Sequence, residues 1–190
     1  MTEFQDIIIS RRTVYRFTEQ SIDKSHLDQA LLAASQAPCH KHTHPWKFFV
    51  IGKKTRQELI PTISRLAKEK SILKNSNDFE KDNSRAINKI ISIPLLIAVT
   101  SKKTPEDSFR EREDYAATVC ALHNMVLSFW SNGVASQWST GSITRDLETY
   151  EILSINSEKE EIIGLLKVGY PESIPTINKP SVDEITKYLE

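Results

Sequence analysis

Apolar residues recur at the three- and four-residue spacing of helices in several parts of the chain. The first pattern starts at the N-terminus, where Thr2 and Gln5 have the spacing of a capping box, and it should end near residues 11–12. A second helix should begin after an N-cap at Asp23 and end before Pro38. The apolar positions of these two helices and of a third are Phe4, Ile7, Ile8, Leu27, Ala30, Leu31, Ala34, Leu59, Ile63, Leu66 and Ala67.

The longest helical pattern lies in the second half of the chain and ends at Asn132-Gly133, a pair common at helix C-termini. Cys120 and His123 are one turn apart on this helix, and we interpret them as a buried thiol and a hydrogen-bonded core histidine. A further helix is expected over about residues 144–153. The broad apolar face of the long helix would hold Ala116, Val119, Cys120, His123, Val126, Leu127 and Trp130.

Runs of apolar, aromatic and β-branched residues predict strands at 46–51, 95–100, 134–138 and 162–168. The second run is continuously apolar, so it should be a buried central strand. Strands separated by helices indicate an α/β or α+β protein, and without internal repeats we expect one domain over residues 1–190.

Two other segments lack a strong pattern. Residues 69–85 are polar and charged, which predicts a surface excursion or a mobile lid. The tail contains Pro171, Pro175 and Pro180, so it should run extended before a short element that starts at Ser181.

Composition and charge restrict the function. The chain has 190 residues with 25 basic and 25 acidic side chains, and this balance argues against a chain-wide nucleic-acid or membrane-surface role. Two cysteines fit a reducing compartment, and the first residues lack the basic start of a signal peptide. The most apolar run, 90–99, is about half the length that spans a bilayer. We therefore expect a cytoplasmic protein with no nucleic-acid or membrane partner.

The first candidate site is Ser10-Arg11-Arg12-Thr13, with Arg16 nearby. The chain has neither GxGxxG nor a P-loop, so a bound phosphate must be held mainly by side chains. Two guanidinium groups and a hydroxyl after a helix can grip a phosphate. The alternative is a helix C-terminus on which cations merely complement the macrodipole.

The second candidate is the segment from Pro38 to Trp46, which contains three histidines. If the segment is extended, His40, His42 and His44 share one face, a spacing that suits a metal ion. We prefer a loop of hydrogen-bonding side chains around a ligand. A Cys39–His40 nucleophile pair is a weaker alternative, because adjacent residues rarely face each other.

The third candidate is Ser136 to Gly141, at the end of a predicted strand, where α/β sheets place ligands. Trp138 offers an aromatic face to a ligand, although a tryptophan is more often part of a core. Ser139 and Thr140 add hydroxyl groups.

In this order, the three motifs resemble those of the nitroreductase family of flavin enzymes. The resemblance covers nearly the whole chain and is nearest to the short, single-domain bacterial branch. It implies an α+β fold of the nitroreductase type, with a central mixed, mainly antiparallel sheet flanked by helices, and an intertwined homodimer. The matching pieces are Arg11-Arg12-Thr13, Gln36-Ala37-Pro38, His44-Pro45-Trp46 with the strand after it, 133–141 and Gly169-Tyr170-Pro171.

The resemblance also implies the chemistry. Two FMN molecules would lie at the subunit interface, each lined by residues of both chains, and hydride would pass from NAD(P)H to a nitroaromatic, a quinone or a related acceptor by a ping-pong mechanism. The flavin carries the hydride, so no catalytic side chain is named. Residues 128–133 match a segment assigned to nicotinamide binding. By position, the flavin would be held by Arg11, Arg12, Thr13, Gln36, His40 (from the partner subunit), His42, Trp138, Ser139 and Thr140.

Some positions depart from the family pattern. His42 stands where many relatives carry Asn, His44 where Gln precedes Pro-Trp, and a C-terminal basic pair is reduced to Lys179. These departures leave two alternatives open: a non-catalytic flavin- or nucleotide-binding module on the same fold, and a metal-dependent enzyme that uses His40, His42 and His44.

Overall fold

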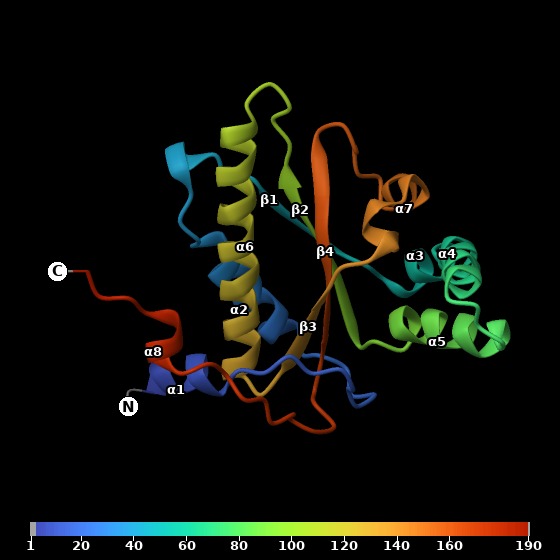
Figure 1. Ribbon diagram of the computed structural model, residues 1–190, viewed down its shortest axis with the longest axis horizontal. Helices are drawn as coiled ribbons and strands as arrows, with labels where there is room; N and C mark the ends of the chain where they lie inside the picture. Colours follow the sequence, from blue (N-terminus) through green and yellow to red (C-terminus); the bar gives the residue numbers. More distant parts are fainter. Residues whose placement is uncertain (1–2, 190) are drawn as a thin grey trace.

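A computed structural model of the chain describes residues 3–189. Its centre is a four-stranded sheet in the order β1-β2-β4-β3, with helices on both faces (Figure 1). All three strand pairs are antiparallel, and a bridge between Thr13 and Ser136 adds a parallel contact at the edge. The mixed helix-and-sheet fold expected from the sequence is confirmed. The strands are β1 (Trp46–Val50), β2 (Leu95–Lys102), β3 (Ala135–Ser139) and β4 (Glu160–Gly169).

Local sequence signals account for several helix ends. The Asp23 carboxylate accepts a hydrogen bond from the Ser25 N–H at 2.7 Å and caps α2, and Gly133 follows α6 with a φ of 71° that favours glycine. The predicted cap at Thr2 lies outside the described residues. The helices are α1 (Glu3–Ser10), α2 (Lys24–Ser35), α3 (Lys53–Glu58), α4 (Ile60–Leu73), α5 (Phe79–Ile91), α6 (Ser108–Ser131), α7 (Leu147–Ile152) and α8 (Val182–Ile185), and η1 (His40–His42) and η2 (Ser142–Arg145) are 3-10 turns.

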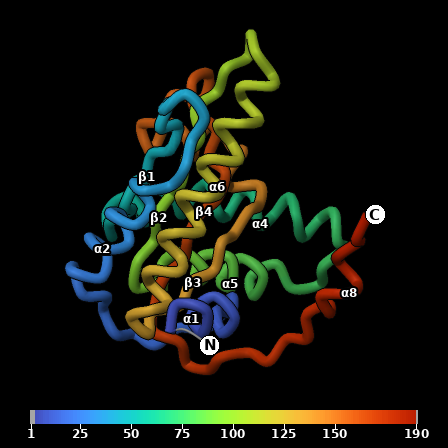
Figure 2. The backbone as a smooth tube through the Cα atoms, turned by 90° about the vertical axis from the view of Figure 1, so that its left-hand side faces the viewer, coloured from blue at the N-terminus to red at the C-terminus, as the bar shows by residue number. Residues whose placement is uncertain are grey.

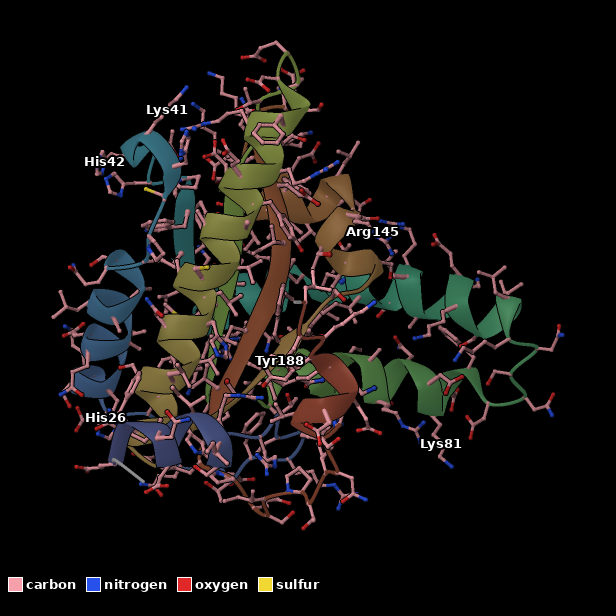
Figure 3. All side chains as sticks on the ribbon, turned by 60° about the vertical axis from the view of Figure 1, so that its left-hand side comes forward. His26, Lys41, His42, Lys81, Arg145 and Tyr188 are labelled. Carbon is pink, nitrogen blue, oxygen red and sulfur yellow. The ribbon has the colours of Figure 1, made fainter. Side chains whose placement is uncertain are left out.

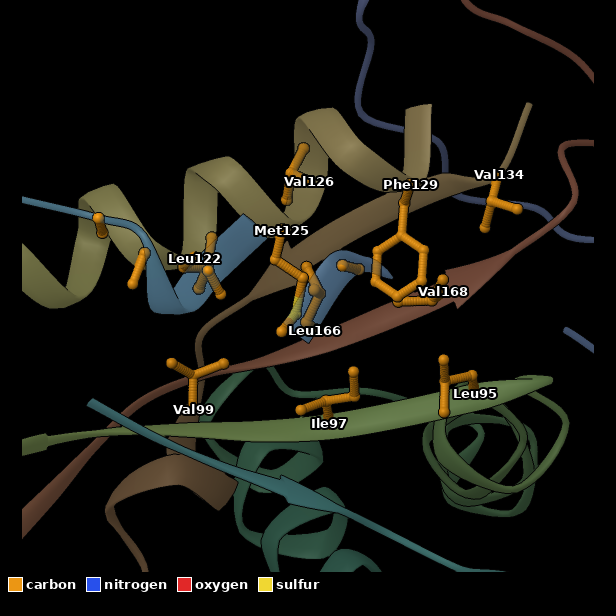
Figure 4. Packing of buried hydrophobic residues seen from close by; sticks show 14 of the residues in the cluster. Leu95, Ile97, Val99, Leu122, Met125, Val126, Phe129, Val134, Leu166 and Val168 are labelled. Atoms are coloured by element: carbon orange, nitrogen blue, oxygen red, sulfur yellow. The ribbon is translucent and has the colours of Figure 1, made fainter. Parts of the chain in front are cut away.

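The core has two layers, one on each face of the sheet. Alternation along β2 points Leu95, Ile97 and Val99 toward α2 and α6, where they meet Met125 and Phe129 (Figure 4). The opposite face of the sheet packs against α3, α4, α5 and α7. Residues 95–99 are all buried, which confirms the predicted central strand.

The predicted apolar face of α6 is right at Val126, which is buried in the core, and wrong at Cys120 and His123. The helix buries Ala117, Ala121 and Leu122 against the sheet, whereas Cys120 and His123 are exposed on its outer side. The interpretation of Cys120 as a buried thiol therefore fails. Apolar residues occur nearly all round this helix, so periodicity alone could not say which side meets the sheet.

The predicted surface excursion at 69–85 is present, but it is helical rather than irregular. Helix α4 continues to Leu73, and α5 begins at Phe79 after a cap in which Asp78 accepts from the Lys81 N–H at 3.0 Å. The two helices form a hairpin that projects from the sheet (Figure 1). Its polar residues are the solvent side of two amphipathic helices rather than a loop.

The tail after β4 runs extended, as predicted, and α8 stands apart from the body (Figure 2). Its apolar side chains are largely exposed: Ile174, Ile177, Val182, Ile185, Tyr188 and Leu189. Among residues 3–189, no helix is both long and apolar enough to cross a membrane.

Candidate functional site

The loop after β3 borders a cavity of about 350 Å³ between the α4–α5 hairpin and the sheet. Ser139, Thr140 and Gly141 line it from one side. A Cβ added to Gly141 would meet no atom within 4 Å, so the backbone there is open to an approaching molecule. The sequence predicts that this loop follows a strand, and in the structure a cavity lies at that end of the strand.

A second cavity of about 790 Å³ adjoins the first, and the two share Arg85, Lys89, Ser139 and Lys167 as lining residues. It reaches the extended segment 15–17, which supplies further lining side chains beside β3. Both volumes are within the range of about 300–1,000 Å³ typical of small-molecule sites.

The shared wall of the cavities is basic, and sequence reasoning missed it. Lys167 pairs with Gln137 across β4 and β3, and its side chain is only 6 % exposed. Burial, together with the nearby charge of Lys89, lowers the pKa of Lys167 to about 8. One signal was available: Lys167 interrupts the apolar run of the last predicted strand.

The basic motif at the end of α1 does not line either cavity. Arg12 Nη1 donates to the carbonyl oxygens of Ile9 at 2.7 Å and Arg11 at 2.9 Å, which is the helix-end role considered as the alternative. Arg11 is half-buried, and burial and the charge of Arg12 lower its pKa. Thr13 pairs with Ser136 at the edge of β3.

Next to this motif, the exposed side of α6 carries His123. Partial burial, followed by the charge of Arg11, lowers the pKa of His123. Because the lowered pKa makes His123 harder to protonate, Arg11 rather than His123 supplies the positive charge here at neutral pH.

The histidine loop, residues 39–45, is held by α6. Thr43 donates to Asp114 Oδ1 at 2.7 Å, and Arg110 Nη2 donates to the His40 carbonyl oxygen at 2.9 Å. The His40 and His42 side chains are exposed. Figure 3 shows His42 on the opposite side of the molecule from Lys81 of α5, and the histidine loop lines neither cavity.

The geometry of the histidine loop does not favour the metal alternative. The rings of His42 and His44 are 6.2 Å apart between centroids, and no group of three His, Cys, Asp or Glu side chains in residues 3–189 is arranged to hold a metal ion. Cys39 Sγ lies 3.7 Å from His44 Nδ1 rather than beside His40. The contact of Cys39 is thus with His44, and the Cys39–His40 pair, the weaker alternative, gains no support.

Trp138 and Gln36 lie outside the cavities as well. The Trp138 ring packs over Gly164, and its Nε1 donates to the Ile163 carbonyl oxygen at 3.1 Å, while 38 % of the residue stays exposed. Gln36 caps α2 and donates from Nε2 to Ser35 Oγ at 3.0 Å.

The Nitroreductase family model matches residues 8–170. The chain belongs to the nitroreductase family. It is 26 % identical over 187 residues to "Putative NAD(P)H nitroreductase YfhC" of Bacillus subtilis, which covers 96 % of this chain and 93 % of that protein.

Solved structures agree with this nitroreductase-family assignment. A nitroreductase-like family protein from Bacillus cereus superimposes with a TM-score of 0.84 at 25 % identity, covering 100 % of this chain and 97 % of that one. A nitroreductase with bound FMN from Bacteroides fragilis has the same fold, with a TM-score of 0.75 at 22 % identity and full coverage of both chains.

Within this nitroreductase-family chain, the predicted site residues fall into separate places. Ser139 and Thr140 line a cavity on the α4–α5 side of the sheet. Arg11, Arg12 and Thr13 lie at the end of α1 and the edge of β3. Gln36, His40 and His42 follow α2, which packs on the opposite face.

Proposed function

We propose that the protein is an FMN-dependent oxidoreductase that transfers hydride from NAD(P)H to a nitroaromatic, a quinone or a related acceptor by a ping-pong mechanism. The observation that carries the proposal is the pair of adjoining basic cavities beside Ser139 and Thr140 in a nitroreductase-family chain. The FMN in the Bacteroides fragilis structure and the name of the Bacillus subtilis relative support the cofactor and the reductant.

The side chains present fit an FMN. Arg11 is half-buried and its guanidinium makes no hydrogen bond or ion pair with a described residue, so a phosphate beside it would compensate its charge. Thr13 is adjacent and carries a hydroxyl. At the other end, Ser139 and Thr140 offer hydroxyl groups, and the open backbone at Gly141 lets a flat ring approach closely.

A bound FMN would supply the hydride chemistry that amino-acid side chains lack. The chain's own residues would bind and orient the flavin and the nicotinamide nucleotide. Arg85 and Lys89, one turn apart on α5, place positive charge on the cavity wall, where it favours a negatively charged reduced ring. Residues 128–133, at the end of α6, remain our proposed contact for the nicotinamide nucleotide.

We also propose that the active form is a homodimer. The outer side of α6 exposes Tyr115, and Leu127 on this helix is only half-buried. The tail adds further exposed apolar side chains. Gln36, His40 and His42 lie away from the cavities of their own chain, so we assign them to the flavin of the partner subunit, with Trp138 beside it.

Absorbance spectroscopy tests the proposal. The purified protein, or the protein after addition of FMN, should absorb in the visible range, and NADH or NADPH should bleach it until a quinone restores the colour. Failure to bind added FMN would contradict the proposal. Binding without bleaching by either nucleotide would instead favour the non-catalytic flavin module.

A further inference from the structure

The smaller cavity combines two kinds of wall. One side is apolar, formed by the inner faces of α4 and α5 and by the floor of the sheet. An occupant with a hydrophobic body would therefore leave water on entering. The apolar lining includes Ile63, Leu66, Ala67, Ala86, Ile90 and Leu165.

The other side of this cavity is strongly cationic. Five basic side chains line it against one acid, Asp82. The Asp82 carboxylate already accepts hydrogen bonds from Ser71 at 3.1 Å and Ser76 at 2.6 Å, and these lower its pKa. Because Asp82 is one carboxylate beside five basic side chains, most of the positive charge of this wall is uncompensated. The basic residues are Lys70, Lys74, Arg85, Lys89 and Lys167.

Lys167 is the deepest of these cations. It lies near the C-terminal end of β4 and is 6 % exposed, and its ammonium makes no hydrogen bond or ion pair with any described residue. Its electrostatic neighbour is Lys89, a like charge. A buried ammonium without a partner is costly, whereas an apolar side chain could pack there as Leu165 does on the same face of β4. Packing therefore does not explain the lysine.

We propose that this cavity receives the electron acceptor and that Lys167 selects acceptors that carry a carboxylate or a similar anionic group on an aromatic body. The apolar wall accommodates the ring, and the ammonium pairs with the anion. The site is bordered by Ser139 and Thr140, so the proposal rests on the proposed function in placing the flavin beside them. The phosphate of FMN has a separate location in our proposal, at Arg11, which does not line this cavity.

A matched pair of ligands tests this assignment: 4-nitrobenzoate and its neutral analogue 4-nitrobenzamide, titrated calorimetrically into the flavin-loaded protein. We expect the carboxylate to bind about tenfold more tightly than the amide. Lys167→Met should abolish the preference and leave amide binding unchanged. Lys167→Arg should retain most of it, and Lys68→Met, an exposed position on α4 that does not line the cavity, should retain all of it.

Equal affinities of the two ligands in the unaltered protein would overturn the proposal. So would a Lys167→Met variant that loses affinity for FMN rather than for 4-nitrobenzoate, because Lys167 would then hold the cofactor. If the protein binds no FMN, the proposed function fails. The same titrations on the flavin-free protein then decide the anion site separately, by whether the preference for the carboxylate depends on Lys167.

Discussion

Thr43 donates a hydrogen bond to Oδ1 of Asp114 over 2.7 Å and so ties the histidine loop to α6. Asp114 is 1 % exposed, and Arg110 Nε lies 3.6 Å from the same oxygen. Its other oxygen, Oδ2, has no hydrogen-bond partner among the described residues. A buried carboxylate with so few partners makes the loop sensitive to the loss of any one of them.

Asp114→Ala should lower the free energy of unfolding by about 2–3 kcal/mol, because it removes a charge-assisted hydrogen bond and leaves Arg110 without its buried partner. Thr43→Val removes only the hydroxyl and should cost about 1 kcal/mol. Urea unfolding of both variants and of the double variant measures the coupling between the two residues. Additive effects would show that the hydrogen bond does not stabilise the loop.

The position of Trp138 depends on the absence of a side chain at Gly164. A Cβ at Gly164 would lie 2.1 Å from Trp138 Nε1 and 2.4 Å from its Cδ1, distances that force the ring to move. Gly164→Ala should therefore break the hydrogen bond of Nε1 to Ile163 and lower stability by about 1–3 kcal/mol.

Gly52→Ala is the matched control, because a Cβ there meets no atom within 4 Å. Thermal unfolding compares the two glycine variants, and Trp138→Phe identifies which part of the tryptophan fluorescence comes from this ring. We expect Gly164→Ala to shift that part to the red. A Gly164→Ala protein as stable as Gly52→Ala would show that the ring adapts without cost.

The exposed tail predicts an effect on assembly rather than on folding. The Glu172 N–H donates to the Arg16 carbonyl oxygen at 3.2 Å, and after Glu172 the described chain forms hydrogen bonds only within α8 and its cap. A chain that ends after Glu172 should therefore unfold at the same temperature as the full-length chain, but it should no longer form the proposed dimer. Light scattering should change from about twice 21.7 kDa toward a single chain at micromolar concentration.

Replacing Ile185, Tyr188 and Leu189 together by serine in the full-length chain controls for the shortened length. Each buried apolar side chain of this size contributes about 1.5–3 kcal/mol to association. The dissociation constant of the dimer should therefore rise by more than roughly tenfold in the triple variant. A triple variant with the unaltered mass at every dilution would exclude these side chains from the interface.

Much of the fold could be predicted because the signals are local. The caps at Asp23 and Gly133 and the continuous apolar run over 95–99 depend on neighbours in the sequence, and each is found as expected. The errors arise because the sequence shows neither which side of α6 meets the sheet nor that the polar residues of 69–85 are the solvent side of two helices. A helix that is apolar on two sides requires a second surface, which the sequence of one chain does not specify.

The site shows the same limit. Ser139 and Thr140 could be predicted to border a ligand because strand ends are recognisable, and they line a cavity. Lys167 stands out as a break in an apolar strand, but its proximity to Arg85 and Lys89 could not be predicted, because these residues come from separate elements that meet only after α5 folds over the sheet. At Arg12 the sequence left two roles open, and the structure shows the guanidinium bonded to carbonyl oxygens at the end of α1.

Lys167 makes the stability of the protein depend on pH in a direction that can be worked out. Burial and Lys89 lower its pKa to about 8 from the ordinary 10.5, so the folded chain holds this proton more weakly than the unfolded chain does. Between about pH 8 and 10.5 the unfolded state binds more protons, and this group makes stability rise with pH. Below that window, both states are protonated and the folded state carries the full penalty.

Lys167→Met should consequently stabilise the protein at about pH 7, by about 1–2 kcal/mol after allowing for screening by solvent in the cavity. The gain should shrink as the pH rises through the window, because the unaltered lysine becomes neutral. Urea unfolding at about pH 7 and about pH 10 measures both values. Lys89→Met, which removes the neighbouring charge, should raise the pKa of Lys167. The pH range over which this group makes stability rise should then begin at a higher pH. A Lys167→Met variant that is less stable than the unaltered protein at neutral pH would mean that the ammonium has a compensating partner, and this outcome would remove the reason to expect an anion beside it.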